Sequence, residues 1–179
     1  MSLAMVTTNV AQTQAVAASL AELARPGDLL LLAGELGAGK TAFAQGFARG
    51  LGVEEPVTSP TFTLVRTYDG GRLRLHHVDV YRLESLQEAL DLGLAEMVDE
   101  GSVTLIEWGD VVAPALPSDF LEVRLGYGRG DDERTMALRT VGGRWSSRAH
   151  TLRRLLAPSS PEPAPPEPAS PETGGTVTC

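Results

Sequence analysis

The sequence predicts an α/β fold in which a mixed sheet with antiparallel hairpins is flanked by helices. Helix-forming segments alternate along the chain with short apolar runs, which is the pattern of a layered α/β domain. Two pairs of strand-like segments are also separated by short loops rich in glycine and acidic residues, as is typical of antiparallel hairpins. The chain has 179 residues, and we expect residues 1–156 to form one domain.

Four segments are rich in helix-forming residues and are predicted to be helices: residues 11–24, 40–49, 85–98 and 144–156. The first should stop at residues 25–28, a turn that contains a proline and a glycine. Gly50 and Gly52 should close the second helix, and Gly93 should break the third. The fourth is expected to close the domain.

Six segments are predicted to be strands: residues 29–33, 61–68, 72–81, 103–107, 120–127 and 134–141. The first is an uninterrupted apolar run, the profile of a strand that is buried on both faces. Residues 69–71 and 128–132 supply the turns of two hairpins. The expected sheet is therefore mixed, with antiparallel additions.

The composition is that of a soluble globular protein, with 42% hydrophobic and 21% charged residues. No apolar run approaches the roughly 18–20 residues of a membrane-spanning helix, and the N-terminus lacks the features of a secretory signal. Cys179 is the only cysteine, which excludes an intramolecular disulfide. We expect a cytoplasmic protein with no membrane partner.

The charge of the chain argues against a protein that grips nucleic acid by itself. The formal net charge is −8 at pH 7, and three of the acidic residues lie beyond residue 156. No basic field of the kind that binds nucleic acid non-specifically is visible. We therefore expect no DNA partner.

Residues 157–179 differ in composition from the rest of the chain. They hold seven of the twelve prolines and contain no lysine or arginine. A segment with so few large apolar residues cannot bury enough surface to offset the entropy cost of ordering it. We predict a disordered Pro-rich tail.

A phosphate-loop pattern, G-x-x-x-x-G-K-[ST], is matched at residues 34–41, which read GELGAGKT. Gly34, Gly37 and Gly39 let the backbone direct its N–H groups toward phosphate oxygens, and the helix that follows adds its N-terminal dipole. Lys40, the only lysine among fifteen basic residues, can reach the β- and γ-phosphates, while the Thr41 hydroxyl can bind Mg²⁺. The loop predicts binding of ATP or GTP with Mg²⁺. The guanine-specific pattern N-K-x-D is absent from the sequence, which favours ATP.

Glu107 ends the apolar strand at residues 103–107 and is the candidate for a second group on the metal side. A carboxylate there can hold Mg²⁺ or orient the attacking water. The alternative is an acidic residue at an ordinary strand end. Trp108 follows directly, and the sequence is equally compatible with a packing role and with a place beside the nucleotide.

Asp79 ends another predicted strand, and the alternation of side chains places His77 on the same face. Asp79 could polarise water, alone or as a hydrogen-bonded pair with His77. The alternatives are a turn cap for Asp79 and a structural role for His77. His76 should point the other way. Zinc is not expected, because the H-x-D spacing lacks a third protein ligand.

Residues 57–62, which read VTSPTF, follow the phosphate-loop helix. Many nucleotide hydrolases place a segment that senses the γ-phosphate at this point. The hydroxyl groups of the segment could bind phosphate or a metal-bound water. A polar turn set by Pro60 is the alternative.

Four segments together resemble one family. GELGAGKT, VTSPTFTLV, HVDVYRL and LIEWGD, in this order and at these separations, are similar to the TsaE family over about residues 7–155. The resemblance implies a P-loop NTPase fold, ATP binding and slow ATP hydrolysis in support of the partner proteins TsaB and TsaD. It also implies a role in forming threonylcarbamoyladenosine at position 37 of tRNAs that read codons starting with A, with tRNA contacted only through the complex.

The resemblance also implies roles for individual residues. The phosphates of ATP would be bound by the loop residues Leu36, Gly37, Ala38, Gly39, Lys40 and Thr41. Thr41 and Glu107 would hold Mg²⁺, and Asp79 would lie by the γ-phosphate. Thr13 matches an N-terminal threonine near the nucleotide, and Arg134 matches a basic residue at the start of a late strand whose role stays open. Glu35 stands where the family usually has aspartate.

Two other classes of function remain as alternatives. A small-molecule P-loop kinase usually inserts a helical substrate domain and an arginine-bearing lid after the phosphate loop, whereas residues 61–81 here predict a hairpin. A nucleotide-gated binding module, in which hydrolysis is incidental, is not separated from an ATPase by the sequence.

Overall fold

The computed structural model describes residues 2–83, 85–99 and 101–156. The Pro-rich tail predicted at residues 157–179 lies outside the described residues. Seven strands form one sheet in the order β1-β7-β6-β2-β5-β4-β3. Their bounds are β1 Ser2–Thr7, β2 Asp28–Ala33, β3 Val65–Tyr68, β4 Leu75–Asp79, β5 Val103–Glu107, β6 Phe120–Tyr127 and β7 Arg134–Val141.

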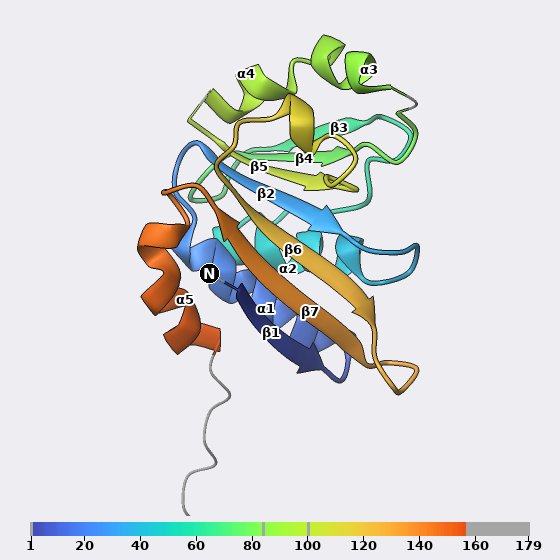
Figure 1. Cartoon of the computed structure of the whole chain (residues 1–179), viewed down its shortest axis with the longest axis vertical. Coiled ribbons are helices and arrows are strands. Elements are labelled where there is room, and N and C mark those ends of the chain that lie inside the picture. The colour runs from blue at the N-terminus through green and yellow to red at the C-terminus, as the bar shows by residue number, and fades with distance from the viewer. Residues whose placement is uncertain (1, 84, 100, 157–179) are drawn as a thin grey trace, which may run out of the picture.

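Helices cover both faces of the parallel part of the sheet (Figure 1). Strands β6, β2, β5 and β4 are parallel to one another, whereas β1, β7 and β3 pair in the antiparallel sense. The helices are α1 Val10–Leu23, α2 Lys40–Leu51, α3 Leu86–Asp91, α4 Leu94–Asp99 and α5 Ala149–Leu156, with 3-10 turns at Ala113–Ala115 and Ser146–Arg148. The α/β class with a mixed sheet, antiparallel hairpins and flanking helices is confirmed.

Two apolar clusters lie on opposite faces of the sheet. Alternate residues of the buried strand β2 divide between them, with Leu30 and Leu32 on one face and Leu29 and Leu31 on the other. The first cluster includes residues of α1, α2 and α5, and the second includes residues of α3 and α4. This two-sided burial explains why β2 reads as a continuous apolar run rather than an alternating one.

The structure corrects several predicted boundaries. The strand expected at residues 61–68 begins at Val65, because the amides of Thr63 and Leu64 donate to the Pro60 carbonyl and form a turn. The strand expected at 72–81 is confined to Leu75–Asp79. Gly50 does not end the second helix. It lies inside α2, and Gly52, in the left-handed region, follows the last helical residue.

Strand β1 was not predicted from the sequence. It pairs antiparallel with β7 over its whole length, from Ser2 opposite Arg139 to Thr7 opposite Arg134. Its side chains alternate between exposed and half-buried, and its short apolar run at residues 3–6 contains only one β-branched residue and no aromatic one, so its strand signal is weak. It therefore forms by adding to an existing edge.

The C-terminal segment is fastened to the start of β2 by a buried ion pair. Arg148 donates from both terminal nitrogens to the Asp28 carboxylate, at 2.5 and 2.8 Å, and its guanidinium lies over the Trp145 ring. The helix predicted at residues 144–156 accordingly begins only at Ala149, after the 3-10 turn that places Arg148. No helix among the described residues is long and apolar enough to cross a membrane.

Candidate nucleotide-binding site

The predicted phosphate loop joins the end of β2 to the start of α2. Gly34, Gly37 and Gly39 all have positive φ angles, of 139°, 79° and 105°. A Cβ atom at position 34 would overlap the backbone carbonyl of Leu125, so a larger residue could not bring the loop this close to β6. At Gly39 a Cβ would meet nothing within 4 Å, which leaves open space directly before the helix N-terminus. Backbone N–H groups and a helix terminus facing open space are the features of an anion site.

Lys40 is held by the loop that precedes it. Its ammonium donates to the carbonyl oxygens of Gly34 and Glu35, at 2.7 and 2.8 Å, and lies 3.6 Å from the centre of the Trp108 ring. Burial lowers the pKa of Lys40 below its ordinary value, although the carboxylates of Glu107, Asp79 and Asp110 act in the opposite direction. The positive charge is therefore already placed at the mouth of the loop, where phosphate oxygens can replace carbonyl oxygens as acceptors.

Thr41 and Glu107 meet across the junction of α2 and β5. The Thr41 hydroxyl lies 3.1 and 3.2 Å from the two carboxylate oxygens of Glu107. Glu107 is 2% exposed, and its Oε1 atom also lies 2.9 Å from Nε2 of the buried His77. The two residues predicted to bind metal are thus brought together, with oxygen atoms of the kind that Mg²⁺ prefers.

Asp79 accepts hydrogen bonds from two hydroxyl groups of the loop after α2. Its Oδ2 lies 2.9 Å from the Ser59 hydroxyl and 2.6 Å from the Thr61 hydroxyl, while Oδ1 accepts from the Tyr81 amide at 2.9 Å. Asp79 therefore caps a turn and also faces the phosphate loop. Of the possibilities left open for these two residues, a hydrogen bond between Asp79 and His77 is not formed: His77 bonds to Glu107 of the neighbouring strand β5 instead.

These groups line a cavity of about 270 Å³ in front of the phosphate loop. Trp108 lines it as well and packs against Tyr81, with ring centres 4.9 Å apart and the ring planes tilted by 42°. Trp108 has a φ of 62°, an uncommon value for a residue other than glycine, and this backbone turn follows directly after Glu107. The two interpretations of Trp108 are compatible in the structure, because its ring packs against one apolar cluster and also lines the cavity beside the phosphate loop.

A second cavity, of about 230 Å³, lies on the other side of the same loop. Thr13 and Arg134 both line it, together with Val10, Ala42 and Asp132. The Thr13 hydroxyl is bonded to that of Thr7 at 2.7 Å, and the Arg134 guanidinium donates to the carbonyl oxygens of Asp131 and Glu133. The residues assigned from the sequence to the nucleotide and to the metal thus gather around one loop, some on each side of it.

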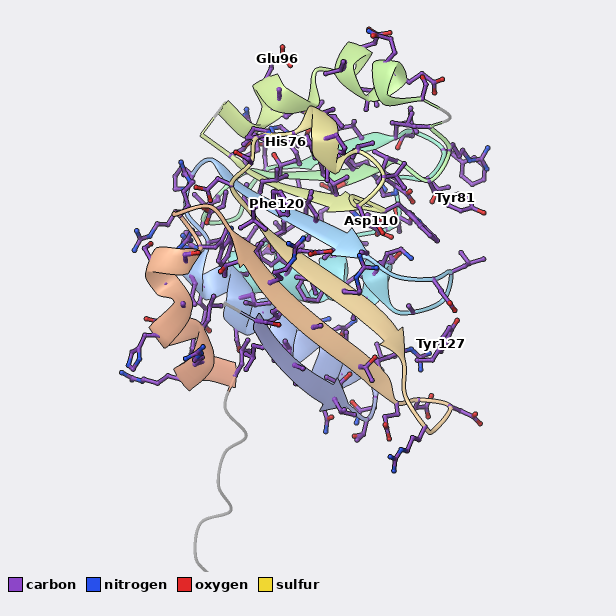
Figure 2. The ribbon with its side chains drawn as sticks, in the orientation of Figure 1. His76, Tyr81, Glu96, Asp110, Phe120 and Tyr127 are labelled. Atoms are coloured by element: carbon purple, nitrogen blue, oxygen red, sulfur yellow. The ribbon has the colours of Figure 1, made fainter. Side chains whose placement is uncertain are left out.

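Tyr127 is a contact of the loop that sequence reasoning missed. Its hydroxyl donates to the Leu36 carbonyl at 2.6 Å, and the Arg134 guanidinium lies over its ring. Figure 2 shows Tyr81 and Tyr127 on the side of the sheet where the C-terminal ends of β2 and β6 lie. The signal available in the sequence was its place at the end of a strand, where ligand sites of parallel sheets lie.

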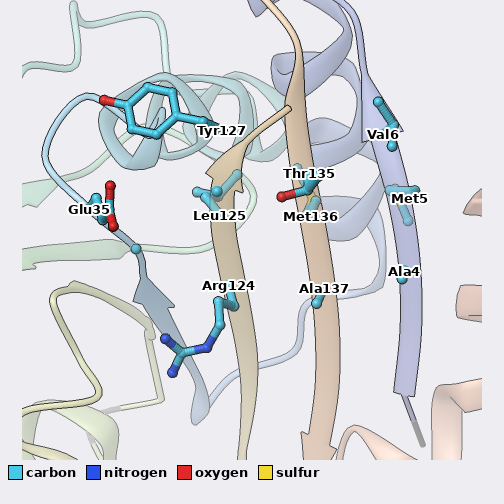
Figure 3. Close-up of a pocket in the computed structure, with 12 residues that line it drawn as sticks. Ala4, Met5, Val6, Glu35, Arg124, Leu125, Tyr127, Thr135, Met136 and Ala137 are labelled. Atoms are coloured by element: carbon cyan, nitrogen blue, oxygen red, sulfur yellow. The ribbon is translucent and has the colours of Figure 1, made fainter. Parts of the chain in front are cut away.

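A larger hollow lies elsewhere on the sheet. It has about 770 Å³ and is lined by residues of β6, β7 and β1 (Figure 3). Its floor consists mainly of small side chains such as Ala4, Thr135 and Ala137, and Glu35 of the phosphate loop lies at its rim (Figure 3). It lacks a cluster of charged groups directed at one point, so we place the chemistry at the smaller cavity.

The oxygen atoms of Thr41 and Glu107 suit Mg²⁺ bound together with a nucleotide better than a metal ion held by protein ligands alone. Among the described residues, no group of three or more His, Cys, Asp or Glu side chains is arranged to hold a metal ion. Mg²⁺ in nucleotide sites commonly takes one or two protein ligands and completes its shell with phosphates and water. Thr41 and Glu107, which lie together in the lining of the cavity, would supply oxygen ligands of this kind.

Comparisons with known proteins point to one family. A sequence model described as threonylcarbamoyl adenosine biosynthesis protein TsaE matches residues 7–136. The tRNA threonylcarbamoyladenosine biosynthesis protein TsaE of Bacillus subtilis (strain 168) is 44% identical over 148 residues, which covers 83% of this chain and 92% of the relative. The protein of the same name from Streptomyces coelicolor is 43% identical over 134 residues, covering 72% of this chain and 90% of the relative.

A solved structure is also similar. It is described as "Crystal structure of Bacillus subtilus YdiB", and it matches with a TM-score of 0.73 at 38% sequence identity. The match covers 86% of this chain and 95% of the other.

Proposed function

The chain belongs to the family of threonylcarbamoyl adenosine biosynthesis protein TsaE, and we propose that it takes part in that biosynthesis as an ATP-binding and ATP-hydrolysing protein. Membership in this family links the chain to threonylcarbamoyladenosine formation in tRNA. The proposal adds the chemistry: ATP bound with Mg²⁺ at the phosphate loop, and slow hydrolysis that depends on the partners TsaB and TsaD.

One observation carries the proposal. Lys40 and Thr41 of α2, Glu107 of β5 and Asp79 of β4 come from three different elements and converge on the cavity in front of the phosphate loop. A cation for the phosphates, two oxygen ligands for Mg²⁺ and a buried carboxylate are the parts that phosphoryl transfer requires, because its catalysis consists mainly of positioning and charge stabilisation.

Each residue has a role that follows from its place. Lys40 and the loop amides would bind the phosphates, and Thr41 with Glu107 would hold Mg²⁺, which neutralises charge that develops on the phosphate oxygens. Asp79, held by Ser59 and Thr61, would accept a hydrogen bond from the attacking water and orient it. The same two hydroxyl groups link Asp79 to the loop at residues 57–62, which gives that loop a means to respond to the γ-phosphate.

The kinase alternative is disfavoured by the segment that follows α2. This segment forms the antiparallel hairpin β3–β4, and a hydroxyl-bearing loop lies where a substrate domain would start. The acidic surface charge suits docking to partner proteins better than direct binding of tRNA.

The experiment that tests the proposal is phosphate release from ATP, measured for the chain alone and with TsaB and TsaD. We expect slow release alone, faster release in the complex, and none when Mg²⁺ is removed. ATP binding without hydrolysis under every condition would favour the nucleotide-gated binding module. Transfer of the phosphate to a small molecule would favour the kinase.

A further inference from the structure

His77 is a buried polar residue that the proposed chemistry does not use. It lies on β4, two residues before Asp79, and the parallel pairing places Asp79 opposite Glu107 of β5. His77 is 0% exposed, and its Nε2 lies 2.9 Å from Oε1 of Glu107. It does not line the cavity in front of the phosphate loop, so it can act on the site only through Glu107.

The hydrogen-bond partners of His77 indicate which of its two ring nitrogens carries the proton. Nδ1 of His77 is buried and has no hydrogen-bond partner among the described residues. A proton on Nδ1 would be a buried donor without an acceptor, which costs free energy. We therefore place the proton on Nε2, where it is donated to Glu107.

The Glu107 carboxylate is then held from two sides. His77 donates to Oε1 from within the core, and the Thr41 hydroxyl contacts both oxygens from α2. A glutamate side chain has three flexible torsions, and without the bond from His77 only the threonine hydroxyl, itself a metal ligand, would restrain the carboxylate. For packing alone an apolar residue would serve at position 77, because it would not bury an unpaired Nδ1.

We propose that His77 is a positioning residue that directs the Glu107 carboxylate toward Thr41 and so sets the affinity for Mg²⁺ bound together with the nucleotide. The inference rests on the proposed function, since it concerns the same site. Partners that orient a metal ligand typically change metal affinity by about 10–100-fold when they are removed.

The test measures ATP affinity by calorimetry over a range of Mg²⁺ concentrations, with binding in excess chelator as the reference. His77→Leu removes the donor, whereas His77→Gln keeps an amide donor near the position of Nε2. His76→Leu is the matched control, because His76 is the adjacent histidine and lies on the opposite face, where it bonds to Thr67. If thermal unfolding shows that His77→Leu does not fold, His77→Asn replaces it, since its shorter amide does not reach Glu107.

We expect His77→Leu to need about 10–100-fold more Mg²⁺ for half-maximal enhancement of ATP binding, with unchanged affinity in chelator. His77→Gln should recover most of the loss, and His76→Leu should resemble the wild type. In a Glu107→Gln background, His77→Leu should add nothing, because the group on which it acts is already altered.

Wild-type Mg²⁺ dependence in His77→Leu would overturn the inference while leaving the proposed function intact. An equal loss in His77→Leu and His77→Gln would also overturn it, since the site would then depend on the imidazole shape rather than on the hydrogen bond. A wild-type chain that binds no ATP at any Mg²⁺ concentration would overturn the proposed function as well.

Discussion

At the scale of single residues, three charged side chains of the site are already held in place by hydrogen bonds when no nucleotide is bound. The Lys40 ammonium is bound to carbonyl oxygens of its own loop, Glu107 is held by His77 and Thr41, and Asp79 is held by two hydroxyl groups. Holding charged groups in place in advance removes the cost of reorganising them during the reaction. Substitutions at these positions should therefore act on binding and on chemistry separately.

Lys40→Ala should weaken ATP binding by at least about tenfold, because it removes the charged donor to the phosphates, worth roughly 1.5–3 kcal/mol. Lys40→Arg should fail as well. The ammonium fits between two carbonyl oxygens and the Trp108 ring, a space for a point charge rather than a planar fork. Binding of a fluorescent ATP analogue measures both variants, and full affinity in either one would contradict the assignment of the phosphate loop.

Glu107→Gln should keep measurable ATP affinity and lose at least about 10²-fold in Mg²⁺-dependent hydrolysis, because the lost charge stabilises the transition state more than the bound substrate. Phosphate release and ATP binding are to be measured on the same preparation. Unchanged turnover would make Glu107 an acidic residue at an ordinary strand end.

Glu122→Gln is the matched control for that experiment. Glu122 lies on β6, outside the residues that line the two cavities beside the loop, and is bonded to Arg139 and Arg124. Burial raises the pKa of its carboxyl, but the hydrogen bonds from Arg139 and Arg124 outweigh this effect and leave the pKa below its ordinary value. The control therefore removes a charge of the same kind at neutral pH, and hydrolysis should be unaffected.

At the scale of elements, the phosphate loop depends on how closely α2 packs against α1. A Cβ atom at Gly46 would overlap the backbone of Gln14, and one at Gly50 would lie 2.6 Å from the Ala18 carbonyl oxygen. The two helices therefore touch through their backbones. Gln14 also bonds to Gln45, which donates to the Val57 carbonyl at the start of the hydroxyl-bearing loop. A shift of α1 would thus displace both α2 and the hydroxyl-bearing loop, which lie on two sides of the site.

Gly46→Ala should destabilise the fold by about 1–3 kcal/mol, although alanine is the better helix former, because the added methyl group would overlap backbone atoms that cannot move aside. Gly143→Ala is the control, since a Cβ there meets nothing within 4 Å. Urea unfolding of both variants measures the difference. Equal stability of the two would show that α1 and α2 are not held at this distance.

At the scale of the whole molecule, the last described residues, 145–156, pack against elements from the first third of the chain. Arg148 joins Asp28 of β2, and Leu152 of α5 lies in the cluster that contains α1. One possible role for the acidic residues of the Pro-rich tail is to bind the arginines of residues 148–154. Arg148 is 5% exposed, so its side chain is not available for such a contact. Arg153 and Arg154 remain exposed on α5.

A chain truncated to residues 1–156 should melt within about 2 °C of the full-length chain, because the removed residues bring no large apolar side chains to bury. Its ATP affinity should also be unchanged, since every residue assigned to the nucleotide precedes residue 135. A chain truncated to residues 1–143 is the contrast: it loses Trp145, Arg148 and Leu152, leaves Asp28 buried without its partner, and should melt markedly lower.

The same truncation tests whether the tail affects partner docking. If the acidic tail acts through exposed charges, association with TsaB and TsaD should change on removal of residues 157–179 at low salt and not at high salt, because screening weakens such attraction. Equal association of both chains at both salt concentrations is the expected result.

The sequence by itself determined the elements whose signals are local. Residues 34–41 predict the phosphate loop because glycine conformation and lysine chemistry depend little on the rest of the fold, and Gly93 separates α3 from α4 as expected. Strands β5, β6 and β7 have the predicted bounds: β5 is a short apolar run buried at every position, and the apolar residues of β6 and β7 recur with the period of a sheet. The predicted site residues also gather around the loop as the strand ends indicated.

The tertiary structure alone decided which groups face each other. His77 bonds to Glu107 rather than to Asp79, and Tyr127 reaches the Leu36 carbonyl, because strand order and register bring β4 beside β5 and β6 beside β2. Strand β1 exists only as an addition to β7. The alternation of residues along a strand predicts which face of the sheet a side chain occupies. The hydrogen-bond partner of that side chain lies on a neighbouring strand, and the packing of the whole sheet determines which strand is the neighbour.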